Sequence, residues 1–214
     1  MVKTDQLIDM LSTNLEPVKR GQVGKTLAWA LVVGGAAAFC VMLTTIGLRT
    51  EPGDASHLSF LALKLLFTLS LIVMGTALLL RLVRPGRDGR RLFNLTLLPF
   101  VVIGLAGAAA LALERPMEWG RMVLGMNWAT CLFCIPLFAV IPFVALIWVL
   151  RKGAPTDLKR TGAIAGLVAG ALGATAYAFH CGDDSMPFIA IWYGAMVALC
   201  AFIGALLGPR LLRW

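Results

Sequence analysis

The chain has 214 residues, of which 59% are hydrophobic and only 14% are charged, and its mean hydropathy is +0.86. Soluble domains are about 45–50% apolar and about 25% charged, so this composition excludes a disordered chain, a disulfide-rich secreted module and an ordinary soluble enzyme. A net charge of +8 would usually suggest nucleic acid, but in so apolar a chain it reports membrane topology, because Lys and Arg collect in cytoplasmic loops.

The chain begins with a mixed polar arm, residues 1–26, in which we expect a short amphipathic helix. Its apolar residues recur at helical spacing and share one face: Leu7, Ile8, Leu11, Leu15 and Val18. Such a helix can lie on the inner leaflet of a membrane or fill a groove on a protein partner. The polar face carries Asp5 and Asp9, and no basic residue lies between Thr4 and Glu16, which favours the protein partner.

Six apolar windows follow, each with the length of about 20 residues that a membrane-spanning helix needs. They are Leu27–Leu48, Phe60–Leu80, Leu92–Leu113, Ala129–Leu150, Thr161–Phe179 and Phe188–Leu207. The predicted fold is an all-α membrane protein, a bundle of six transmembrane helices preceded by the amphipathic cytoplasmic helix. We expect residues 27–207 to form the membrane domain and residues 208–214 a cytoplasmic tail.

The basic residues divide unevenly between the two sides of this topology. Fifteen lie in the arm, in the second and fourth connections and in the tail, whereas four lie on the other side: Arg49, Lys64, Arg115 and Arg121. Both termini are therefore predicted to be cytoplasmic. Lys64 is the one charge inside a span, and we expect its long stem to carry the ammonium group back to the interface.

Two cysteines lie on the outer side, Cys131 at the end of the fourth span and Cys181 in the last loop. Two thiols at the same depth can form a disulfide or bind a soft metal ion. His180, Asp183 and Asp184 are candidate accessory ligands because they flank Cys181. A static structural disulfide and two unrelated thiols are the alternatives.

Cys134 completes a C-x-x-C pattern with Cys131, and it is a further accessory candidate. The pattern would suit a membrane thiol–disulfide oxidoreductase, but in redox enzymes it normally opens a helix of a soluble fold. A metal or small-molecule transporter is the other alternative, and the absence of Asp, Glu and His from the span interiors counts against it. Since nothing else resembles a catalytic site, we expect neither an enzyme nor a resident cofactor.

Glycines recur every fourth residue in the fifth span, at Gly162, Gly166 and Gly170, and Gly173 lies nearby. Small residues at this spacing let helix backbones approach closely. The pattern predicts helix packing, either within the bundle or between the subunits of a homo-oligomer.

Several short segments, taken in order on a frame of six spans, resemble one family over essentially the whole chain. They are Lys3-Thr-Asp-Gln-Leu-Ile-Asp9, Pro17-Val-Lys-Arg20, Cys131, Arg151-Lys-Gly-Ala-Pro-Thr156, His180-Cys-Gly-Asp-Asp-Ser185, Trp192-Tyr193 and Arg210-Leu-Leu-Arg-Trp214. The chain resembles the NrsF-type family of bacterial membrane anti-sigma factors.

The resemblance implies a protein of the bacterial inner membrane that holds an extracytoplasmic-function (ECF) sigma factor inactive. It implies release of that factor under stress, including heavy-metal and oxidising stress. Cys131 and Cys181 match the two signal-sensing cysteines of the family, whereas Cys134 lies outside the pattern. Either a Cys131–Cys181 disulfide or transient metal binding by the two thiols is expected. The zinc-binding domain of other anti-sigma factors is missing, so the arm is expected to capture the sigma factor through Leu7, Ile8, Leu11 and Leu15.

Overall fold

The computed structural model describes Thr4 and residues 22–49, 55–83 and 90–213. Most of the predicted sigma-binding arm, including Leu7, Ile8, Leu11 and Leu15, lies outside these residues. All regular structure in the described part of the chain is helical. Six helices in it are long and apolar enough to cross a membrane, which confirms the predicted all-α fold with six candidate spans.

Four of the six candidate spans are single helices: α2 (Gln22–Thr45), α3 (Ala55–Leu82), α7 (Trp128–Leu150) and α8 (Leu158–Ala178). The third candidate span consists of α4 (Arg90–Leu95) and α5 (Leu98–Leu113). The sixth consists of α9 (Met186–Phe188), a π-helical turn (Ile189–Tyr193) and α10 (Gly194–Leu211). A 3₁₀ turn (Pro116–Glu118) and α6 (Trp119–Leu124) connect α5 to α7. The predicted windows match these elements, with bounds shifted by up to five residues.

The break in the third crossing has a local cause. Pro99 occupies the first turn of α5, where the missing N–H of proline costs no helical hydrogen bond. A helix that runs into a proline from its N-terminal side loses a hydrogen bond and clashes with the ring. The segment Leu92–Leu113, predicted as one helix, is therefore interrupted at Thr96 and Leu97.

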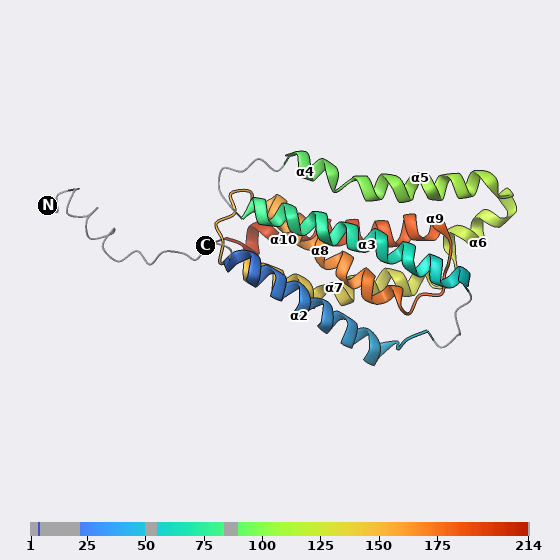
Figure 1. Ribbon diagram of the computed structural model, residues 1–214, viewed down its shortest axis with the longest axis horizontal. Coiled ribbons are helices and arrows are strands. Elements are labelled where there is room, and N and C mark those ends of the chain that lie inside the picture. The colour runs from blue at the N-terminus through green and yellow to red at the C-terminus, as the bar shows by residue number, and fades with distance from the viewer. Residues whose placement is uncertain (1–3, 5–21, 50–54, 84–89, 214) are drawn as a thin grey trace.

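Helix α8 lies at the centre of the bundle and packs against α10, α7, α3 and α2 (Figure 1). Its mean hydropathy of 1.4 is the lowest of the six candidate spans, and 83% of its most apolar stretch is buried. The low hydropathy and the high burial of α8 have one cause. A helix surrounded by other helices needs small residues for close packing more than it needs large apolar side chains for contact with lipid.

The predicted packing role of the α8 glycines is confirmed, and their partners belong to the same chain. A Cβ atom added to Gly166 would lie 2.2 Å from the carbonyl oxygen of Cys200 on α10. Gly162 faces Gly204 and Gly208 of α10 in the same manner, and Gly173 faces the backbone of α7. The glycine stripe is thus used within the bundle.

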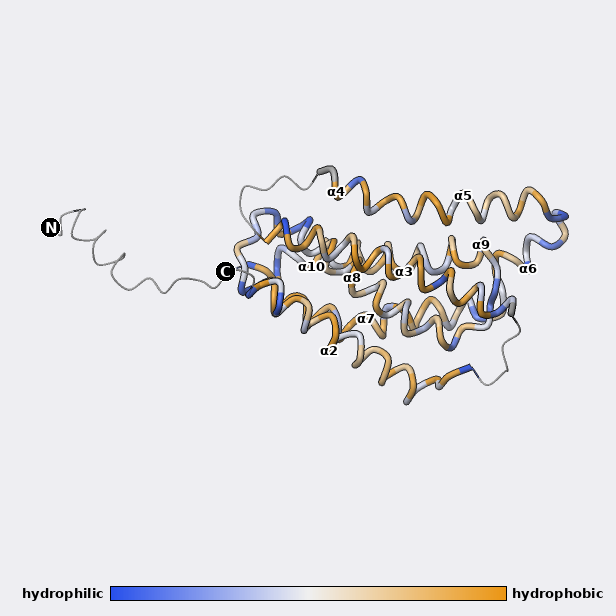
Figure 2. The backbone as a smooth tube through the Cα atoms, in the orientation of Figure 1, coloured by the Kyte–Doolittle hydropathy of each residue, from blue (hydrophilic) through white to orange (hydrophobic). Residues whose placement is uncertain are grey.

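The first residues of α2 and the last residues of α10 lie at the same end of the bundle (Figure 1). We call it the basic end, because it gathers these described residues: Lys25, Arg81, Arg151, Lys152, Lys159, Arg160, Arg210 and Arg213. The opposite end, the cysteine end, holds α6, α9 and the start of α7. Figure 2 shows hydrophobic residues along the helices and hydrophilic residues gathered at the two ends.

Candidate functional site

The loop after α8, residues 179–185, enters the cysteine end of the bundle and carries one of the predicted sensor thiols inside. The side chain of Cys181 is 2% exposed, and Cys131 in the first turn of α7 is 0% exposed. The two thiols lie within electrostatic range of one another, next to Tyr177 and Tyr193. All five cysteines of the chain are free. Cys131 and Cys181 are therefore buried thiols at the same end of the bundle, and their sensing role stays a prediction.

Asp184 ties this loop to α2 and α3. Its Oδ1 accepts a hydrogen bond from Lys64 Nζ at 3.0 Å, and its Oδ2 accepts one from Arg49 Nη1 at 3.2 Å. The ring nitrogen His57 Nδ1 also contacts Oδ2. One carboxylate thus holds three basic side chains, two from α3 and one from the segment after α2.

Lys64 corrects an expectation from the sequence. Its ammonium group does not reach back to the interface, because the residue is 1% exposed. Besides the Asp184 contact, Nζ donates to the carbonyl oxygen of Cys181 at 3.0 Å. A buried charge in a span needs a polar partner, and here the loop folds inward to supply a carboxylate and a backbone carbonyl.

Asp183 ties the same loop to the turn before α7. Its two carboxylate oxygens accept hydrogen bonds from the backbone N–H groups of Met126, at 3.0 Å, and Asn127, at 2.7 Å. Gly125 in this turn has φ +59, and a Cβ there would lie 2.7 Å from the Asp183 carboxyl carbon. Glycine is required at this position because of the positive φ angle and because a side chain would clash with Asp183.

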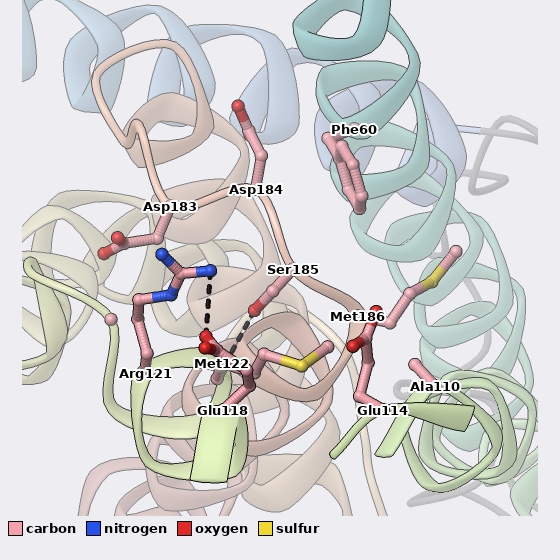
Figure 3. A pocket seen from close by; sticks show the side chains of 11 residues that line it. Phe60, Ala110, Glu114, Glu118, Arg121, Met122, Asp183, Asp184, Ser185 and Met186 are labelled. Carbon is pink, nitrogen blue, oxygen red and sulfur yellow. Dashed lines mark hydrogen bonds and ion pairs between the residues drawn. The ribbon is translucent and has the colours of Figure 1, made fainter. Parts of the chain in front are cut away.

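Figure 3 shows that the carboxyl groups of Asp183 and Asp184 point in different directions from their neighbouring positions. We call these two residues and their partners the aspartate junction. Ser185 adds a hydrogen bond from its hydroxyl to the Met122 carbonyl at 2.7 Å. The loop that carries Cys181 is therefore fastened on one side to α2 and α3 and on the other to the segment before α7.

The junction sets the ionisation of both the loop carboxylate and the loop thiol. Burial acts to raise the pKa of Asp184, but hydrogen bonds from His57, Lys64 and Arg49 prevail and hold it below its usual value. Burial raises the pKa of the Cys181 thiol, and the charge of Lys64 opposes this only in part. At neutral pH the carboxylate is therefore charged and the thiol is protonated, so Cys181 is a slow nucleophile while it remains buried.

An open pocket of about 410 Å³ lies beside the loop, and Asp183, Asp184 and Ser185 form one of its walls (Figure 3). Glu118 and Arg121 on the opposite wall form an ion pair at 3.0 Å, with Arg121 largely exposed. Small solutes can thus reach the flank of the loop without entering the helix bundle.

The accessory ligands predicted from sequence have other partners in the structure. His180 donates through Nδ1 to the carbonyl of Gly47 at 3.1 Å, and Asp183 and Asp184 belong to the junction. Cys134 is partly buried on α7. Among the described residues, no group of three or more His, Cys, Asp or Glu side chains is arranged to hold a metal ion. Metal binding by Cys131 and Cys181 stays a prediction.

Sequence reasoning missed the three basic partners of Asp184. Lys64 carried a usable signal, because a lone charge within a span marks a buried polar contact. Arg49 and His57 carried none, since a basic residue in an outer loop is ordinary.

The known proteins to which the chain is similar belong to one family. The family described as NrsF, negative regulator of sigma F, matches residues 11–214. A probable anti-sigma-F factor NrsF from Azospira oryzae is 33% identical, and the anti-sigma-F factor NrsF from Caulobacter vibrioides is 31% identical. Both alignments cover the full length of both chains. No solved structure matches.

Proposed function

We propose that this chain, which belongs to the NrsF family of negative regulators of sigma F, is an inner-membrane anti-sigma factor controlled by the loop that carries Cys181. Family membership implies a negative regulator whose partner is a sigma factor, and the family is regulatory rather than enzymatic. We propose further that the partner is of the ECF class. The regulatory role of the family argues against the two alternatives, an oxidoreductase and a transporter.

Both termini face the cytoplasm in this proposal. Support comes from the collection of basic residues at the end of the bundle where α2 begins and α10 ends. Residues 1–26 then form the cytoplasmic arm, residues 27–207 the membrane domain and residues 208–214 the cytoplasmic tail. The arm binds the sigma factor through Leu7, Ile8, Leu11 and Leu15.

Cys131 and Cys181 act as the sensor. This step is supported by the burial of both thiols at the end of the bundle opposite the start of α2, where polar contacts fasten the loop that carries Cys181. An oxidant such as diamide takes up two electrons and two protons as the two thiols become a disulfide. A soft cation such as Cd²⁺ would instead displace two protons and bind both thiolates. Because both thiols are buried, either reaction requires the loop to open.

The first test replaces the two sensor cysteines. In the Cys131→Ser/Cys181→Ser variant, a reporter of sigma-dependent transcription is expected to lose its induction by diamide and by Cd²⁺, since neither bond can form. Cys200→Ser is the matched control, because it removes another buried thiol from a different part of the bundle, and it should respond as wild type. Full induction in the double variant would remove the sensor assignment.

The second test concerns the arm. Full-length protein purified from solubilised membranes should carry a small sigma factor with it, which mass spectrometry can identify. Deletion of residues 1–20 should abolish recovery of the sigma factor. The same deletion should turn the transcription reporter on without stress. Leu11→Asp on the apolar stripe should weaken recovery at least tenfold. Thr13→Asp adds the same charge on the opposite face of the expected helix and should leave recovery intact. Undiminished recovery after the deletion would show that the arm is not the capture element.

A further inference from the structure

Helix α2 connects the two functional ends of the molecule, because the arm leads directly into it and its far end meets the Cys181 loop. Three contacts make the second connection. The His180 ring donates to the Gly47 carbonyl at 3.1 Å, and the Arg49 N–H donates to the Phe179 carbonyl at 3.3 Å. The Arg49 guanidinium binds Asp184 at 3.2 Å.

The Arg49 guanidinium also lies against the loop backbone. A Cβ atom added to Gly182 would lie 3.3 Å from Arg49 Cζ. The guanidinium therefore packs closely against the backbone at position 182. Displacement of the loop near Cys181 must move this group or break its contacts.

Helix α2 is attached to the rest of the bundle along one stripe. Its buried residues follow helical spacing: Leu27, Ala30, Gly34, Ala38 and Met42. Side chains on another face, Trp29, Val32 and Val33, are exposed. Because α2 packs on α7 and α8 along one face, while its opposite face is exposed among the described residues, α2 has room to tilt.

The close approach between α2 and α7 lies near the middle of α2. A Cβ on Gly34 would lie 2.9 Å from the Cα of Pro142, so the two backbones touch there. Helix α2 has 24 residues and is about 36 Å long, and Gly34 lies about halfway along it. A tilt about this contact moves the cysteine end of α2 in one direction and the arm end in the other.

Arg49 differs from Lys64 in what its loss would leave behind. Lys64 is almost fully buried, whereas 26% of the Arg49 side chain is exposed. Without Arg49, Asp184 keeps Lys64 and His57 as partners. The loop would therefore stay fastened to α3, and only its connection to α2 would be weakened.

We infer that Arg49 is a positioning residue that couples the Cys181 loop to α2, so that displacement of the loop tilts α2 about Gly34 and moves the sigma-binding arm. This inference rests on the proposed function, in which the loop thiols respond and the arm captures the sigma factor. A ligand or bond at the thiols shifts the position of α2 only if it favours one of the two states over the other.

The test separates sensing from transmission. Arg49→Gln and wild type are compared in two measurements: alkylation of Cys181 by a membrane-impermeant maleimide, and the ratio of diamide-induced to basal sigma-dependent transcription. We expect Cys181 to be alkylated in Arg49→Gln at the wild-type rate, both before and after diamide treatment. The induction ratio of the variant should fall at least fivefold toward 1. Arg49→Lys keeps the ion pair with Asp184 and should keep most of the ratio. Arg121→Gln removes an exposed charge from the same end and should behave as wild type.

An unchanged induction ratio in Arg49→Gln overturns the coupling role. Faster Cys181 alkylation in that variant before diamide also overturns it, because Arg49 would then support the loop. The proposed function has its own failure: no wild-type induction, or induction that survives the Cys131→Ser/Cys181→Ser change. That result would overturn the coupling as well, and it is recognised without any Arg49 variant.

Discussion

The Lys64→Met variant is expected to lose about 3 kcal/mol of stability and to expose Cys181 to alkylation in the absence of any signal. Methionine replaces the apolar stem of lysine and lacks only its terminal ammonium group, so the packing of α3 is retained while the buried charge is removed. The Cys181 carbonyl then has no donor at this position, and Asp184 loses its most buried partner. Removing one member of a buried ion pair costs about 3–5 kcal/mol, and the lower figure applies because Arg49 and His57 remain.

Two measurements check this result. Thermal denaturation in detergent, followed by size-exclusion chromatography, should show a lower midpoint for Lys64→Met, and maleimide labelling with mass spectrometry should show faster modification of Cys181. Arg121→Met is the matched control, because its ion pair with Glu118 is exposed and contributes little. If Cys181 is labelled at the wild-type rate in Lys64→Met, the aspartate junction is not what keeps the thiol buried.

The Gly166→Val variant is expected to be the most damaging change in the membrane domain. The first added atom would lie 2.2 Å from the carbonyl oxygen of Cys200, and the nearest atoms belong to the backbone, which cannot rotate away. Helices α8 and α10 must separate, which costs about 3 kcal/mol or more for an overfilled core. We expect little monodisperse protein after extraction in detergent.

Gly104→Val is the control for this experiment. Gly104 lies in α5, and beyond its own turns of helix no described heavy atom lies within 4 Å of a Cβ built there, so the same side chain is added without a clash. Its yield and elution profile should match wild type. Equal yields of the two variants would show that α8 and α10 are not packed through their glycines.

The sequence predicted the six candidate spans because each is an apolar run of sufficient length, a property that does not depend on the partners of the helix. It predicted the glycine packing for a similar reason, since the four-residue spacing is local. The interruption of the third crossing was missed although Pro99 is visible in the sequence, because hydropathy averages over a proline.

The aspartate junction could not be predicted, because its partners are far apart in the chain. Lys64 and Asp184 are separated by 120 residues, and Asp183 meets backbone N–H groups more than 50 residues away. From the sequence alone, the nearest chemistry for Asp183 and Asp184 was the thiol of Cys181, so they were interpreted as metal-ligand candidates. In the folded chain they neutralise a buried lysine and accept hydrogen bonds from a turn, and both functions depend on the tertiary arrangement.

The low hydropathy of α8 has a consequence for how the protein is made. A segment rich in glycine and alanine partitions weakly into lipid by itself, and its hydropathy of 1.4 is well below the 2.7 of the span before it. The ribosome completes α8 before α10, yet the α8 glycines pack against α10. The glycine face of α8 that packs on α10 therefore stays without its partner until the last helix of the chain has been made.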